Sequence, residues 1–397
     1  MLERLAIYGG KPVREKTLPY GRQWIDEQDI AAVTHTLQSD WLTTGPTVIE
    51  FEREFADFVG VKEAVVLSNG TAALHAAMHA LGIKPGDEVI VSPMTFAASA
   101  NCIVYQGGTP IFADVDARTL LLDPSKIESK ITPRTKAVIA VDYAGQPCDY
   151  DALNTLAEKY ELKVVADSCH ALGASYKGQK AGSLGDLNIF SLHPVKHITT
   201  GEGGVVTTDD SELARKMRVF RNLGISSDHW QREKEGSWYY EIIDLGFNYR
   251  LTECQCALGI SQLRKLPGWI KRRQKIAECY DNAFKNSLIV KPLGKNLDAI
   301  HVYHLYVIML NTAMLRATRG EIFSALRAEG IGVNVHYIPV HLHPFYRRKF
   351  GTGAGLCPIA EQSYEQIISL PIFPKMSDED VADVINAAFK VTEAFTS

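Results

Sequence analysis

Short runs of apolar, β-branched residues recur up to about residue 250, and most are followed by a turn or a helical pattern. Within these runs the apolar positions do not alternate with polar ones, which is typical of a sheet covered on both faces. The alternation of strands and helices predicts a mostly parallel α/β sheet with helices on both faces. The predicted strands are Glu63–Ser68, Asp87–Ser92, Ala137–Tyr143, Lys163–Asp167, Leu187–Ser191 and Gly204–Thr208, and the clearest helices are Thr71–Leu81 and Tyr150–Tyr160.

The pattern changes after about Arg250. A long helical region over Thr252–Asn286 contains Pro267-Gly268, which is expected to break or kink the helix. The elements predicted beyond it are a strand at His304–Leu310, a helix at Glu321–Glu329 that ends at Gly330, and a short strand at Gly332–Tyr337. We therefore expect a large domain over residues 1–258 and a smaller α+β domain over residues 259–397.

Composition narrows the class of protein. The 397 residues are 46% hydrophobic and 22% charged, with a formal net charge of -4, which is ordinary for a soluble globular protein of two domains. Lys and Arg are not clustered, and this argues against a nucleic-acid partner. The N-terminal residues lack the apolar core of a secretory signal, and no apolar run approaches the roughly 18 residues of a membrane span. We expect a cytoplasmic protein without a membrane partner.

Cysteine usage also agrees with a cytoplasmic protein. The seven cysteines are odd in number, are scattered along the chain and form no C-x-x-C pair. A disulfide framework or a zinc site is therefore not expected, and reduced thiols in or near the core are.

The segment Ser68-Asn69-Gly70-Thr71 joins a predicted strand to a predicted helix. Glycine permits a tight turn, and the backbone N–H groups and dipole of a helix start suit an anion. We expect Thr71 to cap the helix and to offer its hydroxyl to a phosphate. A helix cap without a ligand explains the same residues, so this segment alone does not decide between the two interpretations.

Asp167 stands at the end of a predicted buried strand, in VVADSCHALGA. In open α/β sheets, ligands bind beyond the carboxyl ends of the strands. A buried carboxylate needs a cationic partner, and a protonated pyridine nitrogen would provide one. A helix N-cap is the alternative role for this acid.

Lys196 lies in FSLHPVKHITTGEGG, whose residues suit neither a helix nor a regular strand and predict a tight loop. A desolvated lysine can form a Schiff base with an aldehyde, and Ser191 in the same segment is within reach of a phosphate. A Schiff-base lysine, an acid for a ring nitrogen and a phosphate site are what pyridoxal 5'-phosphate (PLP) chemistry needs. Together the three segments favour a PLP enzyme over the alternative that Lys196 is an ordinary surface lysine. Nothing in the sequence indicates a metal site.

Several motifs, in this order, resemble the DegT-type family of sugar aminotransferases, which have the fold-type-I PLP architecture. The likeness covers nearly the whole chain, from SDWLTTGPTVIEFEREFADFVG through SNGTAALHAAM, SPMTFAASAN, VDYAGQPCD, ADSCHALGA, FSLHPVKHITTGEGG and GFNYRLTECQCALG to VHYIPVHLHPFY and SLPIFP. Within the family, DSCHALGA, SLHPVKHITTGEGG and VHYIPVH are most similar to the pseudaminic acid pathway branch. That branch aminates C4 of a UDP-linked 4-keto-6-deoxy-N-acetylhexosamine, with L-glutamate as the donor.

The resemblance implies roles for residues around the cofactor ring. Lys196 matches the Schiff-base lysine, and Asp167 matches the acid that faces the pyridinium nitrogen. Phe96 matches the aromatic residue stacked on the ring, although core packing also explains a phenylalanine. His170 falls where many relatives have glutamine near the phenolic oxygen, a departure that resembles the pseudaminic acid branch.

Other roles concern the phosphate, the sugar and a second subunit. Gly70, Thr71 and Ser191 match the phosphate cup, and Asn248 in GFNYR matches an asparagine that reaches the cofactor phosphate of the neighbouring subunit. The resemblance thus implies a homodimer with shared active sites. His336 and Tyr337 fall where the small domain approaches the sugar, although packed side chains on a strand are the commoner explanation.

Three alternatives remain. A PLP-dependent sugar dehydratase of this family would lack the lysine, so the intact HPVK motif counts against it. An aminotransferase for a different nucleotide-linked keto-sugar would share all the motifs. A non-catalytic PLP-binding regulator would be favoured by a DNA-binding segment or a basic patch, and the sequence shows neither.

Overall fold

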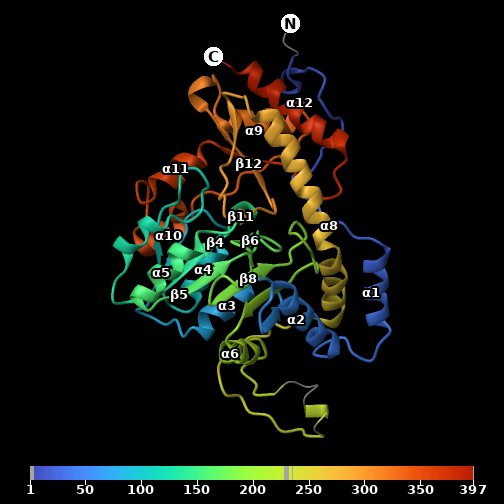
Figure 1. Ribbon diagram of the computed structural model, residues 1–397, viewed down its shortest axis with the longest axis vertical. Helices are drawn as coiled ribbons and strands as arrows, with labels where there is room; N and C mark the ends of the chain where they lie inside the picture. Colours follow the sequence, from blue (N-terminus) through green and yellow to red (C-terminus); the bar gives the residue numbers. More distant parts are fainter. Residues whose placement is uncertain (1–3, 228–231, 235, 397) are drawn as a thin grey trace.

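Buried β-branched residues build the central sheet. The computed structural model describes residues 4–227, 232–234 and 236–396. Within them lies a seven-stranded sheet of order β1-β9-β8-β5-β4-β2-β3 (Figure 1). Its strands are β1 (Glu63–Leu67), β2 (Glu88–Val91), β3 (Thr109–Phe112), β4 (Thr135–Val141), β5 (Lys163–Asp167), β8 (Leu187–Ser191) and β9 (Gly204–Thr208). Only β9 runs antiparallel to its neighbours in this sheet, which confirms the predicted mostly parallel arrangement.

Helices cover both faces of this sheet. Val65 and Leu67 of β1 belong to a different hydrophobic cluster from Ala64 and Val66, whose side chains point to the opposite face. The first cluster includes residues of α3, α4, α5 and α6, and the second includes residues of α2 and α8. These helices are α2 (Pro46–Val59), α3 (Gly70–Ala80), α4 (Ala98–Tyr105), α5 (Tyr150–Tyr160), α6 (Ser211–Arg221) and α8 (Glu253–Phe284). The continuous apolar pattern of the strands reflects this double coverage.

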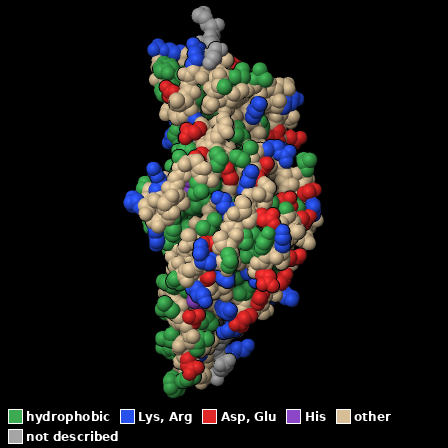
Figure 2. Space-filling view, turned by 90° about the vertical axis from the view of Figure 1, so that its left-hand side faces the viewer, with side chains coloured by type: hydrophobic (Ala, Val, Ile, Leu, Met, Phe, Trp, Pro, Cys, Tyr) green, Lys and Arg blue, Asp and Glu red, His purple; other side chains and the backbone are tan. Residues whose placement is uncertain are grey.

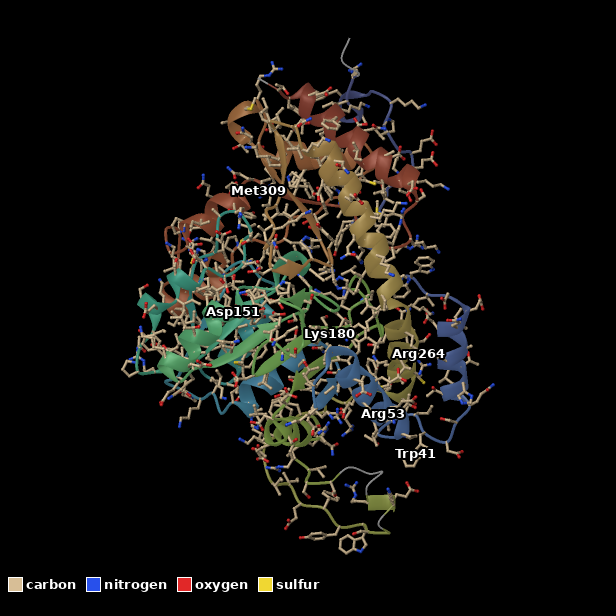
Figure 3. All side chains as sticks on the ribbon, in the orientation of Figure 1. Trp41, Arg53, Asp151, Lys180, Arg264 and Met309 are labelled. Atoms are coloured by element: carbon tan, nitrogen blue, oxygen red, sulfur yellow. The ribbon has the colours of Figure 1, made fainter. Side chains whose placement is uncertain are left out.

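The helix α8 runs from the large sheet to the C-terminal part of the chain (Figure 1). Its first half packs on α2, where Gly259 allows close approach because an added Cβ would lie 2.5 Å from the Phe51 ring. Arg264 of α8, labelled in Figure 3, also donates to Glu54 of α2 at 2.6 Å. The break predicted at Pro267-Gly268 is wrong, because α8 continues through both residues.

Tertiary packing explains this continuity. Proline removes one helical hydrogen bond and costs about 3 kcal/mol in a helix interior. Leu263 and Leu266, just before Pro267, are buried against the large sheet, and Ile276, further along, is buried in the C-terminal core. Anchoring at both ends offsets the local cost.

The C-terminal part has a second, antiparallel sheet, and the hydrophobic cluster around it also includes Leu5 and Leu18 from the N-terminal segment. The sheet has the order β10-β12-β13, and a further small sheet has the order β11-β6-β7. The strands of these two sheets are β6 (Ser175–Tyr176), β7 (Gln179–Lys180), β10 (Val290–Pro292), β11 (Ala299–Ile300), β12 (Tyr306–Leu310) and β13 (Ile367–Leu370). Further α-helices among the described residues are α1 (Glu27–Leu37), α9 (Arg319–Ala328), α10 (Pro344–Phe350), α11 (Pro358–Tyr364) and α12 (Asp378–Ala394). Met309 marks β12 in Figure 3.

The strand predicted over Gly332–Tyr337 is wrong. Ile331 and Asn334 form isolated bridges to Leu18 and Ser369, and the segment is otherwise irregular. The N-terminal segment and β13 both contact this segment. Its backbone hydrogen bonds are therefore divided between two partners and do not form a continuous β-ladder. The division at residue 258 falls inside α8 and stays a prediction.

The surface carries both signs of charge. Figure 2 shows Lys and Arg side chains interspersed with Asp and Glu over one face.

At the lower end of the molecule, the segment after α6 exposes large hydrophobic side chains, among them Trp238 at 85% and Leu245 at 78%. Among the described helices, none combines the length and apolar character that a membrane crossing requires.

Candidate active site

A cleft of about 820 Å³ lies at the carboxyl ends of β4, β5 and β8. Residues of the large sheet form one side, and residues between α8 and α10 form the other. The cleft is lined by most of the residues singled out from the sequence, namely Gly70, Thr71, Phe96, Asp167, His170, Ser191, Lys196, His336 and Tyr337. A hollow of similar volume, about 910 Å³, lies against α5 and contains none of them.

Asp167 ends β5 and is 6% exposed. Ser99 Oγ donates to its Oδ2 at 2.5 Å, and the Cys169 backbone N–H donates to its Oδ1 at 3.2 Å. The Ser99 hydroxyl also lies 2.7 Å from the Thr95 hydroxyl. Asp167 caps no described helix, so its carboxylate is held by short polar contacts while it faces the cleft.

Lys196 lies in the loop between β8 and β9. This loop is ordered by its own hydrogen bonds, since Thr199 Oγ1 donates to the Leu192 carbonyl and Gly201 N–H donates to Thr199 Oγ1, both at 2.9 Å. Lys196 is half-buried, and burial lowers the pKa of its amine, against the opposing effect of Cys169 and Asp167. The loop therefore holds a lysine that gives up its proton more readily than a surface lysine does.

The turn from β1 into α3 brings the predicted phosphate residues together. Asn69 caps α3 by accepting from the Ala72 N–H at 2.8 Å, so the cap predicted at Thr71 is wrong. This leaves the Thr71 side chain available to the cleft. An added Cβ on Gly70 would lie 3.0 Å from the Ser191 Cβ, which shows how closely the turn approaches the end of β8.

His170 and Tyr337 meet across the cleft wall. The Tyr337 hydroxyl lies 3.0 Å from His170 Nε2, whereas His170 Nδ1 is buried with no partner among the described residues. Burial lowers the pKa of His170 well below its ordinary value, and nearby Lys196 adds to this effect. His170 is therefore neutral, and one of its ring nitrogens has no partner among the described residues.

Other imidazoles surround this pair. His304 packs on His170 with ring centroids 4.4 Å apart, and burial lowers its pKa as well. Burial and Lys196 lower the pKa of His336 to about 3, and its Nδ1 lies 2.8 Å from the Ser369 hydroxyl. His197 is buried behind Lys196, whereas His193 is exposed. His170, His304 and His336 are consequently uncharged.

Phe96 and Asn248 are more exposed than the other predicted site residues. The Phe96 side chain is 61% exposed over the cleft, 6.3 Å from the Tyr337 ring, so it is not a core residue. Asn248 does not line the cleft and is exposed, paired with Asn222 through an isolated bridge. Asn248 therefore does not line the cleft of its own chain.

Sequence reasoning missed Ser99, His304 and Tyr20, which all line the cleft. Ser99 lies within the quoted motif SPMTFAASAN, and that motif is the one signal that pointed to it. Its contact with Asp167 joins residues from two different strand–helix units, which a single sequence does not reveal.

The model of the DegT/DnrJ/EryC1/StrS aminotransferase family matches residues 23–389. The chain belongs to this family. Spore coat polysaccharide biosynthesis protein SpsC of Bacillus subtilis is 46% identical to this DegT/DnrJ/EryC1/StrS aminotransferase over 377 residues, which are 94% of the chain and 97% of SpsC.

Solved structures show the same likeness. Helicobacter pylori PseC, an aminotransferase involved in the biosynthesis of pseudaminic acid, has a TM-score of 0.89 and 34% identity, covering 96% of this chain and 100% of PseC. Spr1654 of Streptococcus pneumoniae, assigned as a sugar aminotransferase and solved in its PLP form, has a TM-score of 0.90 and 35% identity, covering 96% and 100%. This aminotransferase has the fold-type-I architecture, and PLP is its cofactor.

The cleft of the DegT/DnrJ/EryC1/StrS aminotransferase fits PLP. Lys196 offers an amine for the aldehyde, Asp167 an acceptor for the ring nitrogen, and the Gly70–Ser191 approach a space for the phosphate. His170 also lines the cleft, and by the resemblance it would lie near the phenolic oxygen. The groups that PLP chemistry requires, an amine, an acid and a phosphate site, are thus all present in the cleft.

Proposed function

We propose that this sugar aminotransferase moves the amino group of L-glutamate to C4 of a UDP-linked 4-keto-6-deoxy-N-acetylhexosamine, a precursor of pseudaminic acid. The products are 2-oxoglutarate and the 4-amino sugar. The reaction type rests on one observation, that Lys196, with its lowered pKa, shares a cleft with the buried acceptor Asp167. The substrate is supported by the likeness to PseC and by histidine at position 170, which resembles the pseudaminic acid branch.

The residues of the chain have distinct tasks. When bound, PLP supplies an electron sink that makes the proton on the carbon beside the amino group acidic. We assign Lys196 Nζ as the base that takes this proton and returns it, because burial favours its uncharged form. Asp167 accepts from Ser99 Oγ and from the Cys169 N–H, which hold the carboxylate in place, and it would accept the ring N–H of the cofactor.

The sugar side of the cleft supplies neutral groups. Phe96, His336 and Tyr337 line it, and His336 stays uncharged because burial holds its pKa near 3. Among the described residues that line the cleft, Lys196 is the only Lys or Arg. A diphosphate and a donor carboxylate both need cations. We infer that a second copy of the chain supplies them, through the exposed segment that carries Asn248 and Arg250.

The shared site can be tested by mixing inactive variants. Lys196→Ala and Asn248→Ala chains should each form inactive homodimers. After co-expression, about half of the dimers should be mixed, and each mixed dimer contains one intact site out of two. Activity should therefore return to about one quarter of the wild-type level. Absence of any recovery in mixed dimers isolated with two different tags would contradict the shared site.

A two-step experiment tests the function. The purified holoenzyme is treated with L-glutamate, and we expect its visible cofactor band to bleach and 2-oxoglutarate to form in equal amount. After removal of the donor, the UDP-linked 4-keto sugar should restore the band, and Lys196→Ala should show neither change. If glutamate bleaches the band but this sugar does not restore it, the reaction type stands and the substrate is wrong.

A second candidate is an aminotransferase for another nucleotide-linked keto-sugar. The likeness to SpsC at 46% identity favours it, because SpsC is named for spore coat polysaccharide biosynthesis. The same experiment with a panel of 4-keto sugars on UDP and TDP distinguishes the two. A non-catalytic PLP-binding regulator would show no bleaching with any donor.

A further inference from the structure

A buried histidine holds the segment that carries Asn248 against α3. His75 lies on α3 and is 5% exposed. Its Nδ1 lies 3.2 Å from the Tyr249 hydroxyl, and its Nε2 lies 2.8 Å from the side-chain nitrogen of Gln106, just after α4. His75 therefore joins two helices of the large domain to the residue that follows Asn248.

Aromatic rings enclose His75. Its ring centroid lies 5.2, 5.1 and 5.2 Å from those of Tyr105, Phe220 and Phe247. Burial, with a smaller contribution from His79, lowers the pKa of His75 to about 4, so the ring is neutral. Phenylalanine in its place would keep the ring and the packing, and it would remove only the two polar contacts.

The backbone of Tyr249 is held on both sides. Its carbonyl accepts from the Ser68 N–H at 2.8 Å, and its N–H donates to the Arg221 carbonyl at 3.0 Å. Adjacent side chains of an extended segment point to opposite sides. Tyr249 is half-buried and contacts His75, whereas Asn248 is exposed. With the Tyr249 side chain fixed inward, Asn248 faces away from its own chain.

The chain before this anchor depends on few buried contacts. Between α6 and Tyr249 it extends away from the large sheet (Figure 1), with Trp238 and Leu245 largely exposed. His79 of α3 lies 2.8 Å from Asp244 in this stretch, but the two side chains are 20% and 45% exposed, so water competes with their contact. The buried contact of His75 is the stronger constraint of the two.

We propose that His75 is a positioning residue for the active site of the neighbouring subunit: by holding the Tyr249 hydroxyl, it directs Asn248 toward the cofactor phosphate bound by a second copy of the chain. The proposal rests on the shared site proposed above. It adds a residue that does not line the cleft of its own chain and on which the PLP affinity of the other chain depends.

Mixed dimers separate this effect from a general disturbance of the fold. A dimer of a Lys196→Ala chain and an Asn248→Ala chain has one intact site, with its asparagine from the first chain and its lysine from the second. His75→Phe is added to either chain, so the two dimers have the same composition and serve as controls for each other. In the first chain it should weaken PLP binding at the intact site roughly fivefold, the equivalent of one hydrogen bond, and in the second chain less than about twofold.

Two further variants test the same contact. Tyr249→Phe removes it from the other side, should give the same loss in the first chain, and should add nothing to His75→Phe. It also carries the test if chains with His75→Phe fail to fold. His75→Asn keeps a polar atom near the position of Nδ1 and should recover part of the affinity.

The test is a PLP titration of the isolated mixed dimers, in which borohydride fixes the bound cofactor to Lys196 and mass spectrometry measures it. A loss of affinity confined to changes in the first chain supports the proposal. Equal losses in both placements, a larger loss in the second chain, or no loss in either overturns it. If the mixed dimer without a change at His75 regains no activity, the shared site itself has failed, and the proposal fails with it.

Discussion

Asp167→Asn replaces a buried carboxylate with an amide of the same shape. The side chain is 6% exposed, and its two observed donors are Ser99 Oγ and the Cys169 N–H. An asparagine oxygen can still accept one of these bonds. The amide carries no negative charge, however, and the cation on the PLP ring nitrogen then has no counter-charge at this strand end. The variant therefore isolates the charge of Asp167 from its shape.

The size of the effect follows from the burial of Asp167. Removing one partner from a buried ion pair costs about 3–5 kcal/mol. If only the reacting state feels the loss, about 3 kcal/mol slows the reaction with L-glutamate by roughly a hundredfold, since each 1.4 kcal/mol is a factor of ten. Lys196 is untouched, so the cofactor should remain attached and visible.

Asp142→Asn is the control, because it makes the same change at a buried position outside the cleft and so measures any general disturbance of the site. Asp142 follows the adjoining strand β4, is fully buried and does not line the cleft. Burial raises its pKa to about 7, against hydrogen bonds from Ser168, the Cys148 N–H and Tyr150. In a stopped-flow assay of band bleaching, Asp142→Asn should slow the reaction less than tenfold. Near-normal bleaching in Asp167→Asn, or equal slowing in both variants, would refute the assigned role.

Three further predictions test the surroundings. Gly70→Ala places a methyl group against Ser191 and should weaken PLP affinity at least tenfold by equilibrium dialysis, whereas unchanged affinity would exclude this turn as the phosphate site. Ser99→Ala removes a buried donor to Asp167 and should lower the unfolding free energy of the apoenzyme by about 2 kcal/mol in urea, and an unchanged midpoint would contradict that hydrogen bond. Pro267→Ala should raise thermal stability, and a loss would show that proline is required within α8.

Local sequence determines much of this fold. Val65, Val66 and Leu67 form an apolar run that is typical of a strand covered on both faces, and β1 lies where the run predicts. Lys196 and Asp167 were predicted near strand ends, and parallel strands bring such ends to one edge. The cleft at that edge contains both residues.

Contacts between distant segments explain what the sequence did not show. Ser99 bonds Asp167, and Tyr337 bonds His170, only because separate parts of the chain pack together. The unbroken α8 depends on packing at both ends of Pro267, which outweighs a local rule. Asn69 and Thr71 are both good capping residues, so the sequence alone does not show that Asn69 is the one that accepts from the Ala72 N–H.

The central claim is that Lys196 carries the cofactor. The direct measurement is borohydride reduction of the holoenzyme, which fixes PLP to the lysine that carries it, followed by proteolysis and peptide mass spectrometry. We predict one modified peptide, with the cofactor mass on Lys196, and none in Lys196→Ala. Modification of a different lysine, or a labelled peptide that persists in Lys196→Ala, would contradict the account.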